Sequence, residues 1–173
     1  MSNDQKKVLA GMAAASVFSV VFFEVVFRLT DFGLTPPGGI ETSGRLEYAL
    51  RWEVLAALCM VAGVAMIANR RFFIADAIEG GTSPAIEIDR RYLQNTLEQL
   101  VLAIVAHLAL VTIVAPESIR AVAVLVMLFV IGRVTFWIGY HHSGPARAFG
   151  FATTFYPTVA VYVYLVSRIA SGS

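Results

Sequence analysis

Residues 133–147 read RVTFWIGYHHSGPAR, and they join the end of one apolar run to the beginning of the next. Arg133 lies inside the first run, Tyr140 follows seven residues later, and Arg147 follows seven residues after that. A charged side chain at the centre of a membrane helix costs several kcal/mol, so it faces the interior of a bundle and pairs there. The stretch therefore predicts membrane helices that enclose a polar site.

The composition indicates a membrane protein. Of 173 residues, 58% are hydrophobic and 14% are charged, whereas soluble domains average about 25% charged residues. The net charge of +1 gives no reason to propose nucleic acid as a partner. The lone cysteine, Cys59, cannot form an intrachain disulfide and is expected to pack as a small hydrophobe. No metal-ligand spacing occurs.

Five apolar runs have the length of about 20 residues that a spanning helix requires. They are Val8–Leu29, about Trp52–Asn69, Tyr92–Ala115, about Ile119–Tyr140 and about Ala148–Ser167. The first run is longer than a signal peptide core and lacks a small-residue cleavage pattern, so we expect a retained helix. The fold class is thus an all-α, integral membrane bundle of five transmembrane helices.

Residues 30–44 and 78–89 are rich in glycine and proline, which predicts loops. Ser143 and Pro145 resemble a cap and an early-turn residue of the last helix. With the N-terminus inside, seven Lys or Arg residues near helix ends fall on the inner side and five on the outer side. This bias predicts a multi-pass protein with a cytoplasmic N-terminus and its C-terminus on the opposite side.

The third and fourth runs place polar residues at one depth. Arg91, Asn95 and Glu98 are spaced i, i+4 and i+7, so they share one helical face. Glu98 lies about 10 Å deeper than Arg91, and Arg133 about 10 Å deeper than Tyr140, on antiparallel helices. We therefore expect Glu98 and Arg133 to form an ion pair.

Such a pair has two interpretations. It could fix the register of two helices and bind nothing. The additional polar residues favour a cleft for a small anionic ligand, open to the cytoplasm and accessible to lipid from its apolar flank. Arg147 supports this reading, because the first turn of a helix already attracts anions.

The remaining polar residues give weaker signals. His107 is expected to be a hydrogen-bonded packing residue, and His141 with His142 make a poor metal site. Glu24 and Arg28, spaced i and i+4, are expected to pair with each other.

The two polar stretches resemble the MAPEG family, the membrane-associated proteins of eicosanoid and glutathione metabolism. RYLQNTLE (91–98) is similar to the family's R-x-x-x-N-x-x-E, and residues 133–147 match its arginine, Gly-Tyr and second arginine. The spacing is closest to the leukotriene synthase and microsomal glutathione transferase branch. The resemblance divides the chain into an extra N-terminal helix with its linker (1–45) and a four-helix domain (46–173).

The resemblance implies a homotrimer that binds glutathione as co-substrate between protomers near the cytoplasmic face. By position, the tripeptide would be held by Arg91, Asn95, Glu98, Arg133 and Tyr140. Arg147 would be the catalytic residue, because it would favour the thiolate, which then attacks a lipophilic electrophile or reduces a lipid hydroperoxide.

The sequence departs from the family pattern in several places. Phe136 and Gln99 stand where the glutathione enzymes often have a tyrosine and an aromatic residue, and a proline often found after the motif glutamate is missing. A hydroxyl lost from the cleft costs about 1 kcal/mol of binding. The alternative function is therefore a non-catalytic lipid-binding or scaffold protein of the same fold. The sequence does not name the second substrate.

Overall fold

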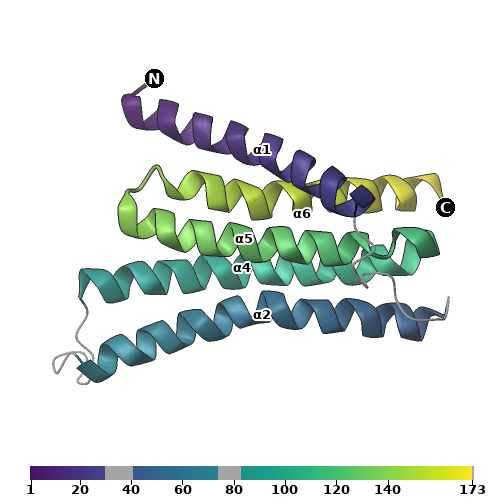
Figure 1. The fold of residues 1–173 in the computed structure, drawn as a ribbon, viewed down its shortest axis with the longest axis horizontal. Coiled ribbons are helices and arrows are strands. Elements are labelled where there is room, and N and C mark those ends of the chain that lie inside the picture. Colours follow the sequence, from purple (N-terminus) through teal and green to yellow (C-terminus); the bar gives the residue numbers. More distant parts are fainter. Residues whose placement is uncertain (30–40, 74–82, 173) are drawn as a thin grey trace.

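The computed structural model describes residues 1–29, 41–73 and 83–172, and helices make up most of these ranges (Figure 1). The elements are α1 (Asn3–Leu29), α2 (Thr42–Phe73), α4 (Pro84–Ile113), the short 3-10 helix η1 (Pro116–Ser118), α5 (Ala121–His142) and α6 (Arg147–Ser171). Five segments are long and apolar enough to cross a membrane, with η1 and α5 forming one of them. The predicted all-α membrane bundle is confirmed.

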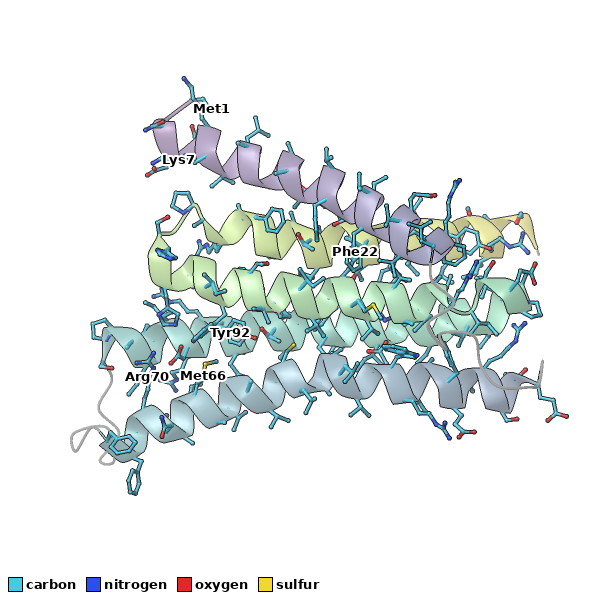
Figure 2. All side chains as sticks on the ribbon, in the orientation of Figure 1. Met1, Lys7, Phe22, Met66, Arg70 and Tyr92 are labelled. Carbon is cyan, nitrogen blue, oxygen red and sulfur yellow. The ribbon has the colours of Figure 1, made fainter. Side chains whose placement is uncertain are left out.

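Successive helices run in opposite directions, so the two termini lie at opposite ends of the bundle (Figure 1). In this view the helices lie in the order α1, α6, α5, α4 and α2. The start of α1, the end of α2 and the α5–α6 turn share one end, and the side chains of Lys7, Arg70 and Tyr92 lie there (Figure 2). This end is the one that the arginine and lysine count predicts to face the cytoplasm.

α5 lies at the centre and α1 at the periphery. Every residue from Ala121 to Val126 is buried, whereas α1 buries only Ala15 and Ser19. α1 packs against α6 and α5, where Gly11 faces Ala148 and Phe18 lies 5.6 Å from Phe149, centroid to centroid. The N-terminal helix is therefore a peripheral element of the bundle.

Two buried polar contacts attach α2 to α4. Arg45 donates to the carbonyls of Val111 (3.1 Å) and Val114 (2.9 Å), which have no helical partner at the end of α4. Deeper in the bundle, His107 Nδ1 lies 2.5 Å from Glu53 Oε1, and both side chains are buried. The prediction that His107 is a hydrogen-bonded packing residue is confirmed, as is the burial of free Cys59.

Several predicted boundaries were wrong. α4 begins at Pro84 with Ser83 as its cap, so residues 84–89 are helix instead of loop. α2 begins at Thr42, inside the predicted linker. Ser143 ends α5 and does not cap α6, whose cap is Ala146. The remaining parts of the two predicted loops, residues 30–40 and 78–82, lie outside the described residues.

α5 and α6 approach each other closely at glycines. A Cβ atom added at Gly150 would lie 2.2 Å from the amide nitrogen of Phe136 and 2.6 Å from the carbonyl oxygen of Gly132. A Cβ atom at Gly139 would lie 2.7 Å from the Ala146 carbonyl oxygen. Small residues permit such backbone contact between membrane helices, so these glycines fix how α6 lies against α5.

We expect Gly150→Ala to destabilise the protein by about 2 kcal/mol or more, because the added methyl group meets backbone and the helices must separate. The matched control is Gly144→Ala in the α5–α6 turn, where a Cβ atom would meet nothing within 4 Å. Thermal unfolding in one detergent measures both variants. Equal melting temperatures for the two would show that the close approach does not constrain the fold.

Candidate functional site

Arg133 is the largest fully buried side chain of the described residues, and it lies where three helices meet. One guanidinium nitrogen donates to Asn95 Oδ1 on α4 at 2.9 Å. The other donates to Thr154 Oγ1 on α6 and lies 3.4 Å from the Gly150 carbonyl oxygen. The Phe136 ring covers the guanidinium, with its centroid 4.6 Å from the central carbon. Every one of these partners is neutral.

The predicted ion pair between Glu98 and Arg133 was wrong. Glu98 is exposed and accepts a hydrogen bond of 2.9 Å from Gln94 on its own helix. The depth estimate was sound, because Arg133 contacts Asn95, less than one turn before Glu98. The predicted direction of the Glu98 side chain was wrong, because Asn95 faces α5 whereas Glu98 faces outward from α4. Arg133 therefore has no carboxylate partner among the residues that the structure describes.

Three of the predicted site residues line an open groove of about 730 Å³ along α2 and α4. They are Arg91, Asn95 and Glu98. Arg91 is held by Glu87 at 2.9 Å, one turn earlier on α4. Arg71 and Arg90 also line the groove, so its cations outnumber its two carboxylates. Asn95 connects this groove to the buried Arg133.

Tyr140 and Arg147 lie together at the α5–α6 turn and do not line the groove. The Arg147 guanidinium stands 4.7 Å from the centroid of the Tyr140 ring. Tyr140 meets Phe136 edge to face at 5.0 Å, and Phe136 in turn covers Arg133. As predicted, Arg147 is in the first turn of α6. One protomer thus joins Arg147, Tyr140, Phe136, Arg133 and Asn95 through successive contacts.

Asp89 is a central residue that lies at the end of the loop predicted over residues 78–89. Its side chain is fully buried and pairs with Arg70 of α2. On α5, His141 Nε2 lies 3.3 Å from Asp89 Oδ1, and Trp137 Nε1 donates to the same oxygen at 3.4 Å. The spacing of Asp89 with the buried Tyr92 and Thr96, at i, i+3 and i+7, was a signal for this burial. Asp89 thus holds the ends of three helices together beside the groove.

The sequence profile described as "MAPEG family" matches residues 50–167. Two curated relatives are similar to the chain, and both are named Transmembrane protein 79. The protein from Mus musculus is 26% identical over 157 residues, which cover 88% of this chain and 40% of the relative. The protein from Bos taurus is 26% identical over 123 residues, covering 70% of this chain and 31% of the relative. The chain thus spans less than half of each relative. No solved structure matches it.

We expect Asn95→Asp to stabilise the ligand-free protein by about 1 kcal/mol, because it gives the buried Arg133 a charged hydrogen-bond partner. The control is Asn69→Asp, the same substitution at an exposed position of α2. Thermal unfolding of the purified proteins tests this. A lower melting temperature for Asn95→Asp than for the control would show that Arg133 is already neutralised by its surroundings.

Proposed function

The chain belongs to the MAPEG family, and from this premise we propose that it is a glutathione-dependent membrane transferase or peroxidase acting on lipophilic electrophiles or lipid hydroperoxides. The observation that carries the proposal is the buried Arg133, whose partners are all neutral. A buried charge without a counterion is costly, and an anionic ligand beside it removes that cost. Glutathione carries two carboxylates and suits such a site.

Asn95 supports the same proposal because it connects Arg133 with the groove. The Asn95 Oδ1 atom accepts a hydrogen bond from Arg133, and Asn95 also lines the open groove along α2 and α4. A ligand carboxylate that replaced this amide oxygen would turn a neutral hydrogen bond into a charge-assisted one, which is about twice as strong. Arg91, Arg71 and Arg90 attract an anion into the groove first.

The proposed assembly is a homotrimer with the groove at the boundary between protomers. Arg91 and Glu98 lie on an exposed face of α4, and charged side chains do not face lipid without a large cost. A neighbouring copy that covers this face would bring its own Tyr140 and Arg147 toward the groove. We place this end on the cytoplasmic side, because its basic residues outnumber those at the other end.

Arg147 has the proposed catalytic role. Its guanidinium and the first turn of α6 both favour an anion nearby, and such surroundings convert a thiol to a thiolate. The thiolate would form a C–S bond to an electrophilic lipid carbon, for example as the C–O bond of an epoxide opens to an alkoxide that takes up a proton. With a hydroperoxide it would form an S–O bond as the O–O bond breaks, the lipid would leave as an alcohol, and a second glutathione would reduce the resulting sulfenic acid to give the disulfide and water. Tyr140, stacked on Arg147, would fix the direction of the guanidinium.

A second candidate function is non-catalytic lipid binding on the same fold. Phe136 favours it, because this buried ring covers Arg133 where the glutathione enzymes often have a tyrosine hydroxyl. Arg133 then keeps its charge while the site loses a hydrogen-bond donor. Measurements of glutathione binding and of thiolate formation distinguish the transferase or peroxidase function from lipid binding.

The first experiment is calorimetric titration of the detergent-purified protein with glutathione. We expect Asn95→Asp to weaken glutathione binding at least tenfold, a loss of about 1.4 kcal/mol in binding free energy. The reason is that the new aspartate carboxylate would occupy the position beside Arg133 that the glutathione carboxylate otherwise takes. Asn69→Asp should bind as the wild type does. No measurable binding by a folded wild-type protein would exclude the glutathione function.

The second experiment follows the thiolate absorbance of bound glutathione against pH. A free thiol with a pKa near 8.5 is only a few per cent thiolate at neutral pH, and an opposite charge within about 4–6 Å lowers a thiol pKa by about 1–3 units. We expect Arg147→Ala to shift the thiolate titration to higher pH and to reduce turnover more than affinity. Arg147→Lys should restore part of the shift. Coincident curves for wild type and Arg147→Ala would favour the lipid-binding function.

A further inference from the structure

Two of the three histidines contact a carboxylate on another helix, and one of these two also reaches water. The His107 side chain, which pairs with Glu53, is only 2% exposed. His141 Nε2 lies 3.3 Å from Asp89 Oδ1, and the His141 side chain is 30% exposed. Histidine is the side chain that ordinarily changes its charge between about pH 5 and 8. The contact between His141 and Asp89 can therefore respond to the pH of the surrounding water.

The Asp89 contacts differ from the other ion pairs of the described residues. Four of those pairs join neighbours on one helix and are largely exposed, and such pairs contribute little to stability. They are Lys7–Asp4, Arg28–Glu24, Arg51–Glu47 and Arg91–Glu87. The second of them, at 2.6 Å, was predicted from the sequence. Asp89 is fully buried, and its partners come from α2 and α5, so a change at this carboxylate alters how three helices are held.

The two oxygens of Asp89 have different partners. Oδ2 accepts from Arg70 Nε of α2, and arginine stays charged at every physiological pH. Oδ1 faces α5, where it accepts from Trp137 Nε1 at 3.4 Å and lies beside His141 Nε2. The attachment of α4 to α2 is therefore independent of pH, whereas the attachment of α4 to α5 includes a group that titrates.

Protonation of His141 strengthens the attachment to α5. A neutral imidazole carries a hydrogen on one nitrogen only, so Nε2 donates in just one of two tautomers. The imidazolium carries a hydrogen on both nitrogens, and its bond to a carboxylate is about twice as strong as a neutral hydrogen bond. Low pH therefore tightens the contact with Asp89. As the pH rises and His141 loses its charge, Trp137 is left to make the stronger contact with Asp89.

The charged groups of the neighbouring helices at this end have partners of their own. Arg70 of α2 binds the other oxygen of Asp89, and Arg147 of α6 stacks on Tyr140. Lys7 of α1 lies 3.9 Å from Asp4 on the same helix. Within α5 itself, His142 is exposed and has no polar contact with another described residue. Asp89 is thus the group whose interaction changes most when His141 takes up a proton.

The end of α5 and the α5–α6 turn form one packed unit (Figure 1). Ser143 donates its backbone N–H to the Gly139 carbonyl at 3.0 Å, and a Cβ atom at Gly139 would lie 2.7 Å from the Ala146 carbonyl oxygen. Arg147 stacks on Tyr140, directly before His141. A change in how His141 is held therefore affects the whole stretch from Gly139 to Arg147.

We propose that Asp89 and His141 form a pH-sensitive latch between α4 and α5. Protonation of His141 fastens the end of α5 and the α5–α6 turn to α4, and loss of the proton releases them. The latch goes beyond the proposed glutathione function and operates whether or not that function holds. If it does hold, the latch also controls the position of Arg147.

The test is hydrogen–deuterium exchange of residues 138–146 in the purified full-length protein, divided by the intrinsic exchange rate at each pH. The two conditions are about pH 5.5 and about pH 8, on either side of the usual histidine pKa of about 6.5. We expect the wild type to be about fivefold better protected at the lower pH, which corresponds to about 1 kcal/mol. His141→Gln should remove this difference, and His141→Lys should keep the higher protection at both pH values. His142→Gln is the matched control and should behave as the wild type does.

A second measurement follows the protonation of His141 itself. Trp52→Phe leaves Trp137 as the single tryptophan, with its ring centroid 5.0 Å from that of His141. A protonated imidazole at this distance quenches indole fluorescence, so emission should fall as the pH is lowered. Adding His141→Gln should abolish the fall, and adding His142→Gln should not.

Four results would overturn the proposal. They are equal corrected exchange of the wild type at both pH values, a pH difference that survives His141→Gln, a difference that His142→Gln removes, and emission of Trp137 that does not change with pH. Circular dichroism verifies that each variant is folded. Exchange measured without glutathione keeps this result separate from the glutathione titration.

Discussion

The fold is organised around a buried guanidinium that has no carboxylate partner among the residues that the structure describes. Arg133 contacts α4 through Asn95 and α6 through Thr154 and Gly150, so one side chain sets the spacing of three helices. These partners are neutral dipoles, which accept hydrogen bonds from its two terminal nitrogens but leave the net charge in place. In the proposed function, an anionic ligand beside Arg133 would supply the countercharge that these dipoles do not.

The close approach of α5 and α6 follows from the same constraint. Thr154 and the carbonyl of Gly150 reach Arg133 only because α6 lies in backbone contact with α5, and that contact requires glycine at 132 and 150. The hydrogen bonds of Arg133 therefore depend on the glycine packing between α5 and α6. Asp89 acts similarly at the helix ends, where it joins Arg70 and His141 across α2, α4 and α5.

The sequence predicted the five helices, their directions and the burial of Arg133, because long apolar runs and a lone charge inside one of them leave few alternatives. It did not predict the partner of Arg133. Rise per residue gives depth, but a side chain's direction depends on helix rotation, and rotation is set by glycine contacts distant in sequence. The start of α4 was missed although Ser83 and Pro84 form an ordinary N-terminal signal. The apolar groove that α1 forms with α4, α5 and α6 could not be predicted, because most of its lining comes from helices distant in sequence from α1.

Phe136 determines what the remaining site can do. Its ring contacts both the Arg133 guanidinium and the Tyr140 ring, so it occupies the middle of the chain of contacts that leads to Arg147. A tyrosine there would add a donor, whereas phenylalanine supplies only its π face, which still favours a cation. The charge that attracts an anion is therefore retained, and one hydrogen bond to it is absent. If the proposed glutathione function holds, affinity for the ligand would depend mainly on the charge of Arg133, and control of its thiol would depend on Arg147.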